Sequence, residues 1–361
     1  MQDLEGKTWI AISLDSMFNL ERGKEKNMAA LAEGYTPLVS ARKVNNGVKS
    51  FITTPAKVIK GGNVISLNND GDGGAGLAYY QPSDFALDTH VTALCPKNIV
   101  LPDALLYMTA SISKQHSIFG HGRSISLPRA KRIQNMIPVT NSREPDYKYM
   151  AEYTKRKRLF LINKYRDYAQ KRIADLGEIS ELPPLNEIEW QTFVVKDIAD
   201  VYSGHDIYAQ ERIDGPTPLV TAVGTNNGIG YFVGNENTSR AEKSISVVRN
   251  GASVCKAFYH KYSALYGNDC RRMKLKHSDS EFVNIFITQM IGMQNKAFSY
   301  SRKLGTERLL NLKIMLPATD SGEPDFTYME QYTKNMMLRK YKQYLAYLDS
   351  KNKTDTIATN D

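Results

Sequence analysis

Apolar residues follow two patterns that alternate along the chain. Short runs rich in apolar residues at 9–12, 192–195 and 243–248 predict β-strands, the last of them buried. Longer apolar stretches at 103–113 and 280–293 predict helices between the strands. Strands and helices that alternate in this way predict an α+β fold.

Residues that tolerate positive φ separate these runs. Asn46-Gly47 and Asn227-Gly228 have the composition of type I′ hairpin turns, because Asn and Gly adopt positive φ at low cost. The glycine-rich stretch 70–76 precedes a strand-like run, whereas a phosphate cradle requires a helix there, so it predicts a loop between strands. The stretch 224–230 likewise fits a hairpin better than a cofactor loop.

Two long stretches predict helices of about 25 to 30 residues. They begin at Asp146 and Asp325, which occupy plausible N-cap positions after a proline. In both stretches, apolar residues recur at heptad spacing, which predicts that each helix packs on another long helix. The simplest arrangement is that the two helices pack on each other. Alternatively, each helix covers only its own domain. The predicted packing residues are Leu159, Ile162, Ala169, Ile173 and Leu176 in the first helix and Leu338, Tyr341, Leu345 and Leu348 in the second.

The chain repeats itself with a period of about 180 residues. Its two tryptophans, Trp9 and Trp190, are 181 positions apart, and 37–41 resembles 218–222 at the same offset. Farther along the offset becomes 179, as for Arg123 and Arg302. So many matches at two nearly equal offsets exclude coincidence, and a period this long indicates duplicated domains rather than a solenoid.

The repeat predicts two tandem mixed α/β domains, each followed by a long helix, with the two helices forming an antiparallel coiled-coil-like pair. A segment with two prolines separates the first helix from the second tryptophan and reads as a linker. The predicted parts are domain 1 at 1–143, a central helix at 144–177, a linker at 178–189, domain 2 at 190–322, a C-terminal helix at 323–350 and a flexible tail at 351–361.

The composition is that of a folded globular protein, with 361 residues of which 42% are hydrophobic and 24% charged. No apolar run approaches the roughly 18 residues of a membrane helix, and the polar segment 1–7 lacks the apolar core of a secretory signal. Three widely spaced cysteines argue against a disulfide framework and a zinc ribbon. The expected compartment is a reducing cytoplasm.

The net charge of +9 permits nucleic acid or an anionic membrane as a partner. The excess lies in the helical segments, because 146–172 carries +6, 325–353 carries +3, and the remaining residues sum to zero. The globular parts would therefore bind nucleic acid through local patches. The charge on the helices fits either a solvated face or contact with phosphates or an acidic partner.

No residues assemble into a catalytic or metal site. The six histidines form no H-E-x-x-H pair, and no phosphate-binding G-x-x-x-x-G-K-[ST] motif is present. The methyltransferase loop Asn/Asp-Pro-Pro-aromatic is missing, because Pro183-Pro184 lies between two leucines. The segment 145–148 hints at a nuclease motif, but its copy at 324–327 lacks the lysine and both open helices, so a capping turn is favoured.

Polar and aromatic loops at matched positions remain as candidate sites. Arg, Asn, Gln and Lys are the side chains that read base edges. Arg123 and Arg302 stand out because both copies keep an aromatic-polar loop around them, whereas most other matched loop sites differ, which would let each half read a different sequence. The predicted DNA-binding residues are Arg42, Lys43, Asn45, Asn46, Lys49, Asn68, Asn69, Lys114, Gln115, His116 and Arg123 in the first half, and Thr225, Asn226, Asn227, Arg249, Lys256, Arg271, Arg272, Lys274, Lys296, Tyr300, Arg302 and Lys303 in the second.

The order of these parts resembles the DNA-specificity subunits of restriction-modification systems. The run 190–204 is similar to the opening of a target-recognition domain in that family, and 309–317 to its end. The resemblance covers roughly 9 to 349 and rests on the order and duplication of loose motifs. One departure is that Glu-Pro-Asp-(Tyr/Phe) replaces the Pro-x-x-x-Glu-Gln helix start common in Type I subunits, which favours Type IIB-like relatives.

The resemblance implies a non-catalytic chain that binds double-stranded DNA and two methyltransferase, or fused methyltransferase-endonuclease, subunits. Restriction subunits are further candidate partners. It implies a bipartite target, no cofactor on this chain, and S-adenosylmethionine and Mg²⁺ in the partner subunits. A helix of about 28 residues is ~42 Å long, slightly more than one turn of B-DNA. The alternatives are a stand-alone tandem module for nucleic acid or glycans and a diverged methyltransferase or nuclease.

Overall fold

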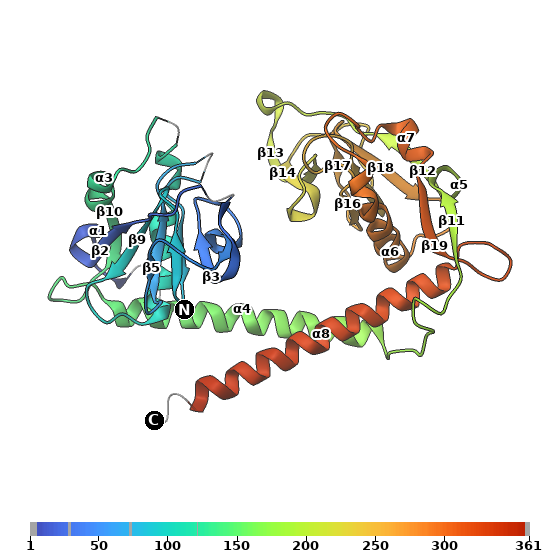
Figure 1. Cartoon of the computed structure of the whole chain (residues 1–361). Helices are drawn as coiled ribbons and strands as arrows, with labels where there is room; N and C mark the ends of the chain where they lie inside the picture. The colour runs from blue at the N-terminus through green and yellow to red at the C-terminus, as the bar shows by residue number, and fades with distance from the viewer. Residues whose placement is uncertain (1–5, 28–29, 72–73, 121, 358–361) are drawn as a thin grey trace. The chain divides into compact units, whose positions relative to one another are not determined.

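The structure is a computed structural model that describes residues 6–27, 30–71, 74–120 and 122–357, with side chains described up to 351. The chain divides into two compact units, residues 1–165 and 166–361. Each unit contains a β-rich domain, and a long helix follows each domain in the chain (Figure 1). The long helix α4 (Tyr147–Leu176) begins in unit 1 and ends in unit 2, and α8 (Phe326–Ile357) lies in unit 2.

Domain 1 contains a two-stranded sheet and two four-stranded sheets, of order β1-β10, β2-β9-β6-β7 and β4-β3-β8-β5. All pairings are antiparallel except that of β3 with β8. The bounds are β1 (Trp9–Ser13), α1 (Leu14–Met17), β2 (Phe18–Arg22), β3 (Glu33–Val39), β4 (Val48–Ile52), β5 (Val58–Ile59), β6 (Val64–Asn68), β7 (Ala78–Gln81), β8 (Phe85–Leu87), β9 (Val91–Pro96), α2 (Pro102–Ser113), α3 (Leu127–Arg132) and β10 (Gln134–Pro138).

Domain 2 repeats this arrangement with sheets of order β11-β19, β12-β18-β15-β16 and β14-β13-β17. The parallel pairing recurs between β13 and β17. The bounds are β11 (Trp190–Val194), α5 (Val195–Ile198), β12 (Ala199–Ser203), β13 (Asp214–Val220), β14 (Ile229–Val233), β15 (Ser244–Val248), β16 (Ala257–His260), β17 (Leu265–Tyr266), β18 (Cys270–Leu275), α6 (Glu281–Gly292), α7 (Thr306–Leu310) and β19 (Lys313–Pro317).

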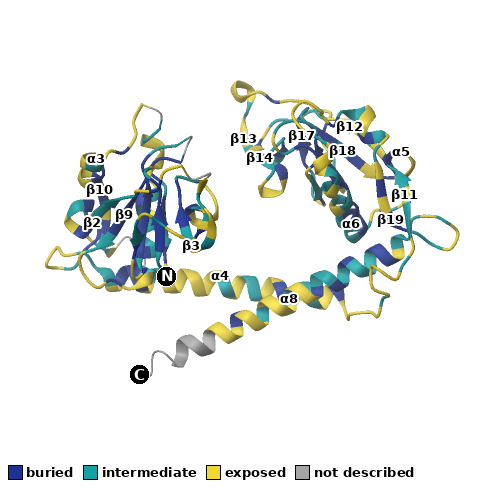
Figure 2. Ribbon diagram, in the orientation of Figure 1, coloured by how far each residue is buried: buried dark blue, intermediate teal, exposed yellow. Residues whose placement is uncertain are grey.

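In domain 1 the core lies between the sheet β2-β9-β6-β7 and helix α2. In domain 2 it lies between the sheet β12-β18-β15-β16 and helix α6. Every residue of β6 and of β15 is buried, as expected for a central strand covered on both faces. Figure 2 shows buried residues concentrated in the sheets of both domains. In domain 1 the apolar side of α2 packs on this sheet, and in domain 2 α6 does the same. Met150 and Met329, at the starts of α4 and α8, are fully buried in these cores, so each long helix is anchored in the domain that precedes it.

The predicted strands, inner helices and helix starts are confirmed. The Asp146 carboxylate accepts a hydrogen bond from the Tyr149 N–H at 2.9 Å, and Asp325 accepts one from Tyr328 at 2.8 Å, as N-cap residues do. The predicted end of the second helix is wrong: α8 continues to Ile357, because no residue of its last turns stops a helix. The rest of the predicted tail, 358–361, lies outside the described residues.

The Asn-Gly turns have the expected positive φ but not the expected two-residue form. The Gly47 N–H bonds to the Val44 carbonyl, so Asn45 and Asn46 are the central residues, with φ of 55° and 53°. Val39 pairs with Val48, and a longer loop therefore connects β3 to β4. The equivalent loop in domain 2 connects Val220 to Ile229 in the same way. The loop therefore spans residues 40–47 in domain 1 and 221–228 in domain 2.

A matched glycine marks a close backbone approach in both copies. A Cβ on Gly23 would lie 1.8 Å from the Asp88 carbonyl oxygen, and one on Gly204 would lie 2.1 Å from that of Gly267. No side chain fits at such a distance, so the repeat keeps glycine where the chain leaves β2 and β12.

Within unit 2, the last turns of α4 pack against α8. The rings of Tyr168 and Tyr341 meet edge to face with centroids 6.1 Å apart, and Arg166 forms an ion pair with Asp349 at 2.7 Å. Arg166 contacts Asp349, whereas Tyr168, farther along α4, contacts Tyr341, which lies nearer the start of α8. The two helices therefore run antiparallel here. Arg172 of α4 also pairs with Glu281 of α6 at 3.3 Å.

The predicted seam residues differ in their burial. Leu159 is 43% exposed, unlike the other predicted residues. The other predicted residues divide into Ala169, Leu176, Leu338 and Leu348, which are buried, and Ile162, Ile173, Tyr341 and Leu345, which are half-buried.

One buried histidine makes the stability of unit 2 depend on pH. His260 is fully buried next to Ser246, and burial lowers the pKa of His260 to about 4. Unfolding returns this pKa to roughly 6.5. As the pH falls below that value, the unfolded chain binds a proton that the folded chain excludes, so unit 2 loses stability.

We predict that lowering the pH from about 7.5 to 5 destabilises unit 2 by roughly 2 kcal/mol through His260. Urea unfolding of a Trp9→Phe chain, followed by Trp190 fluorescence, measures this. His260→Gln should remove that part of the pH dependence, whereas the exposed control His277→Gln should retain it. An unchanged pH dependence in His260→Gln would contradict the assignment.

Candidate nucleic-acid interface

Three loops of domain 1 meet at one end of its sheets. The Asn68 side-chain amide and the Tyr79 hydroxyl both donate to the Arg42 carbonyl, at 3.0 and 2.9 Å. The Ile125 N–H donates to the Asn69 carbonyl at 2.6 Å. These bonds connect loops that are far apart in sequence, namely 40–47, 69–77 and 114–125.

Domain 2 brings together the equivalent loops. The Lys256 ammonium donates to the Gly224 carbonyl at 3.2 Å, and the Leu304 N–H donates to the Arg249 carbonyl at 2.9 Å. The second bond is the counterpart of the Ile125–Asn69 bond at the repeat offset. The loops are 221–228, 249–256 and 293–304.

The loops of Arg123 and Arg302 share one main-chain hydrogen bond. The Arg123 N–H donates to the Gly120 carbonyl at 2.9 Å, and the Arg302 N–H to that of Ser299 at 3.0 Å. Phe119 and Phe298, at the starts of these loops, pack against the two cores. Each arginine side chain is exposed, so a turn anchored by an aromatic ring presents a guanidinium to solvent in both copies. His121, within the first loop, lies outside the described residues.

Most other predicted residues on these loops are also exposed. Lys303 lies over the ring of Tyr300, with its ammonium 5.5 Å from the ring centroid, and Tyr300 is 73% exposed. A cation and an aromatic ring at one loop tip can contact phosphate and base together. The exposed members of the prediction are Lys43, Asn45, Lys49, Lys114, His116, Thr225, Asn226, Lys256, Lys274, Lys296, Tyr300 and Lys303.

Three predicted residues are buried and cannot read bases in this structure. Asn68 and Asn69 are at most 1% exposed, and Asn69 accepts a hydrogen bond from Thr92 at 2.8 Å. Arg271 is 5% exposed and donates to Thr306 and to the Asn268 carbonyl, both at 2.8 Å. Their polar side chains hold the loops together from inside, which sequence alone does not distinguish from exposed loop residues.

Lys274 is exposed but lies at the wrong end of its strand. Cys270, where β18 begins, is paired with Val248, next to the Arg249 loop. Lys274 is four residues farther along β18, roughly 13 Å from that end at strand spacing. It is opposite Asp200 on β12, away from the gathered loops.

Several predicted side chains are partly engaged within the protein. Asn46 donates to the Tyr80 carbonyl at 2.8 Å, and its counterpart Asn227 donates to that of Tyr259 at 3.3 Å, so this matched pair fixes the loop in both copies. The others are Arg42, whose guanidinium donates to the Val48 carbonyl, Gln115, whose amide donates to the Gln134 carbonyl, Arg249, paired with Asp269, and Arg272, stacked over Tyr202.

A hydrogen-bonded acid–base pair that sequence reasoning missed lies at the base of each loop cluster. In domain 1, His90 Nδ1 is 2.9 Å from Asp70, and this hydrogen bond raises the pKa of His90. In domain 2, Arg249 is 3.1 Å from Asp269, which is the repeat counterpart of His90. The acid follows the central strand in domain 1 and precedes the neighbouring strand in domain 2, but Asp70 and Arg249 are not matched positions, because Arg249 corresponds to Asn69. The repeat offset therefore does not reveal these pairs from sequence.

Among the described residues, no three His, Cys, Asp or Glu side chains are grouped so that they could hold a metal ion. None of the described helices is both long and apolar enough to cross a membrane.

Comparison with known proteins identifies the class. The family model described as the Type I restriction modification DNA specificity domain matches residues 6–161 and 187–345, one match for each domain with its helix. The chain belongs to this family. It is therefore the DNA specificity subunit of a restriction-modification system, with two target-recognition domains, and by family it is non-catalytic.

One relative and two solved structures are similar to the chain. The chain is 28% identical over 328 residues to the Type II restriction enzyme specificity subunit S.BcgI of Heyndrickxia coagulans, covering 90% of this chain and 93% of that one. The fold is similar to the S subunit of a Type I system from M. genitalium, with a TM-score of 0.50 at 16% identity over 98% of this chain and 96% of that one. The HsdS subunit from Thermoanaerobacter tengcongensis matches at a TM-score of 0.32 and 14% identity, over 95% and 91% of the two chains.

We predict that Arg302→Ala impairs recognition of one half of the DNA target and Arg123→Ala impairs recognition of the other. Loss of a bidentate base contact costs about 1–3 kcal/mol, which is roughly a 5- to 150-fold loss of discrimination. The two variants serve as controls for each other, because the two loops share the same main-chain hydrogen bond. Sequence selection with each variant measures the effect, and unchanged preference in both would contradict the assignment.

Proposed function

We propose that each domain reads one half of a bipartite DNA target. The observation that carries this proposal is that an equivalent main-chain bond joins two matched loops in each domain, while most side chains on the loops differ. The same scaffold with different side chains would give two readers of different sequence. The turn around Arg123 and Arg302 is the common element.

The gap between the half-sites would depend on the long helices. α4 is a single helix of 30 residues, which is ~45 Å of helix, anchored at its start in the core of unit 1. In unit 2 its end is fixed by Tyr341, Asp349 and Glu281. We therefore expect the number of residues in α4 to influence the gap between the half-sites.

The helices would also dock the partner subunits. Leu159, Phe160 and Leu161 on α4 are 43%, 62% and 62% exposed, and such a run on a helix surrounded by basic side chains favours contact with another protein. We propose methyltransferase, or fused methyltransferase-endonuclease, subunits as these partners. S-adenosylmethionine and Mg²⁺ would belong to them rather than to this chain. The three cysteines are free, which fits the reducing cytoplasm proposed for the complex.

A selection experiment tests the proposed reading. The chain would be purified with the methyltransferase of its own system and used to select fragments from random-sequence duplex DNA. We expect co-purification, and a split motif with a constant gap of about half a helical turn or more. A single short contiguous motif, or no enrichment by a co-purified complex, would contradict paired readers and favour a stand-alone tandem binding module.

A further inference from the structure

A network of hydrogen bonds connects the central strand of domain 1 to its 40–47 loop. Ser66, in the middle of β6, accepts a hydrogen bond from the Gln81 side-chain amide at 3.0 Å. The same amide nitrogen donates to the Asn46 carbonyl at 3.0 Å, and the Asn46 amide donates to the Gln81 side-chain oxygen at 3.4 Å. Ser66 is fully buried and Gln81 is 3% exposed, so the network links the interior of the domain to a surface loop.

Strand register gives Gln81 a counterpart in domain 2. Gln81 is paired with Val64, the first residue of β6, and His260 is paired with Ser244, the first residue of β15. The third residue of both central strands is a fully buried serine, which in β15 is Ser246. A buried glutamine in domain 1 is therefore a buried histidine in domain 2, next to an equivalent serine.

His260 reaches the 221–228 loop through one further side chain. His260 Nε2 lies 2.9 Å from the Ser246 hydroxyl oxygen, and His260 Nδ1 lies 3.3 Å from the Tyr262 hydroxyl oxygen. The Asn227 side-chain amide donates to the Tyr262 hydroxyl at 3.1 Å. A histidine and a tyrosine together thus make the connection that a single glutamine makes in domain 1.

The donors and acceptors of the domain 2 network agree with one neutral form of His260. The Ser246 hydroxyl donates to the Phe258 carbonyl at 3.4 Å, so it accepts from His260 Nε2. Burial lowers the pKa of His260 to about 4, so at neutral pH the ring has a single N–H and Nδ1 accepts from the Tyr262 hydroxyl. Tyr262 can then accept from Asn227 at the same time. A polar network in which each donor has an acceptor is rigid.

The asparagine at the end of each network belongs to a turn with an unfavourable backbone. Asn45, Asn46 and Gly47 have φ of 55°, 53° and 76°, and the equivalent residues 226–228 have φ of 50°, 53° and 72°. Residues with a Cβ rarely adopt this conformation, and a run of them persists where the surroundings hold it. Asn45 and Asn226, each next to the anchored asparagine, are exposed and are among the predicted DNA-binding residues. The anchor therefore sets the position of an exposed candidate reader.

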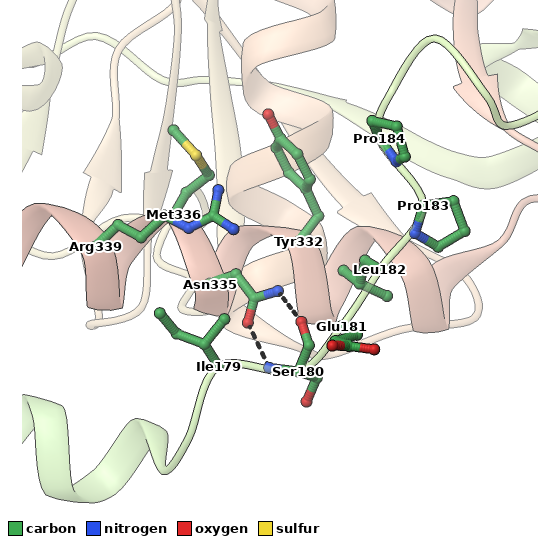
Figure 3. Close-up of a pocket in the computed structure, with 10 residues that line it drawn as sticks. All are labelled: Ile179, Ser180, Glu181, Leu182, Pro183, Pro184, Tyr332, Asn335, Met336 and Arg339. Carbon is green, nitrogen blue, oxygen red and sulfur yellow. Dashed lines mark hydrogen bonds between the residues drawn. The ribbon is translucent and has the colours of Figure 1, made fainter.

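A buried amide holds one other irregular segment in a similar way. The Asn335 side chain, which is 4% exposed, donates to the Ser180 carbonyl at 2.8 Å and accepts from the Ser180 N–H at 3.1 Å (Figure 3). Asn335 thus has the chemistry of Gln81, but it holds the linker before domain 2, which carries none of the predicted DNA-binding residues. This makes Asn335 a matched control for the loop anchors.

We propose that Gln81 in domain 1, and His260 with Tyr262 in domain 2, are positioning residues that fix the 40–47 and 221–228 loops for DNA reading. This rests on the proposed function, in which these loops belong to the two readers. Gln81 and His260 are buried and act only through the loop asparagines. Base edges are read by hydrogen bonds of strict geometry, whereas phosphate contacts mainly provide affinity. Loss of an anchor should therefore lower base preference more than overall affinity for duplex DNA.

The experiment measures base preference separately in each half-site. Each variant would be purified with the methyltransferase of its system, and duplexes with single base changes in one half-site would compete with the intact target. Tyr262→Phe removes a single oxygen atom, and we expect it to lower base preference roughly three- to tenfold in the half-site of domain 2 only. Gln81→Leu should have this effect in the half-site of domain 1 only.

Two further variants separate positioning from a general structural role. His260→Leu should act like Tyr262→Phe, whereas His260→Gln should restore most of the base preference, because glutamine at the matched position of domain 1 bonds directly to the loop main chain. The control Asn335→Leu should leave base preference unchanged in both half-sites. Circular dichroism would confirm folding, and if His260→Leu does not fold, Tyr262→Phe still decides.

The parent chain tests the proposed function, and the variants test the positioning role. If the parent selects a split motif but Tyr262→Phe and Gln81→Leu keep its base preferences, the positioning role is wrong. A loss spread equally over both half-sites, or an equal loss in Asn335→Leu, would also overturn it. A parent chain that selects no split motif would contradict the proposed function itself, and the positioning role with it.

Discussion

The candidate recognition surface of each domain depends on one main-chain hydrogen bond at the end of the central strand. In domain 1 it joins the Ile125 N–H to the Asn69 carbonyl, and in domain 2 it joins the Leu304 N–H to the Arg249 carbonyl. The bond fixes an arginine-bearing turn against the loop that follows a fully buried strand. A buried strand cannot shift without exposing its residues to water or losing its ladder, so the turn inherits the rigidity of the core.

This arrangement separates what must stay constant from what can vary. The constant parts are main-chain bonds and apolar contacts, such as Phe119 and Phe298 on the cores. The variable parts are side chains that point away from those contacts. The base of each cluster shows the difference, because Asp70 is hydrogen-bonded to His90 in domain 1, whereas Arg249 forms an ion pair with Asp269 in domain 2. A scaffold of this kind tolerates new loop residues, which is what a specificity subunit requires to acquire a new target.

The sequence predicted the duplicated architecture well because the repeat supplied two independent readings of each element. The strands at both tryptophans, the inner helices and the N-caps at Asp146 and Asp325 follow from local patterns. The candidate site was less predictable. Asn68, Asn69 and Arg271 have the composition of exposed loop residues, yet tertiary packing buries them, and Lys274 lies at the far end of its strand. The pairing of His90 with Asp70 depends on two strands meeting in space, which composition does not encode.

The central claim is that each domain reads its half of the DNA target independently of the other. A chain in which residues 9–138 replace 190–317, from the start to the end of the two-stranded sheet, tests it directly. Selection from random duplex DNA, with the methyltransferase present, should return the half-site of domain 1 twice, separated by the gap of the parent chain. A folded chimera that still selects the original second half-site would contradict the account.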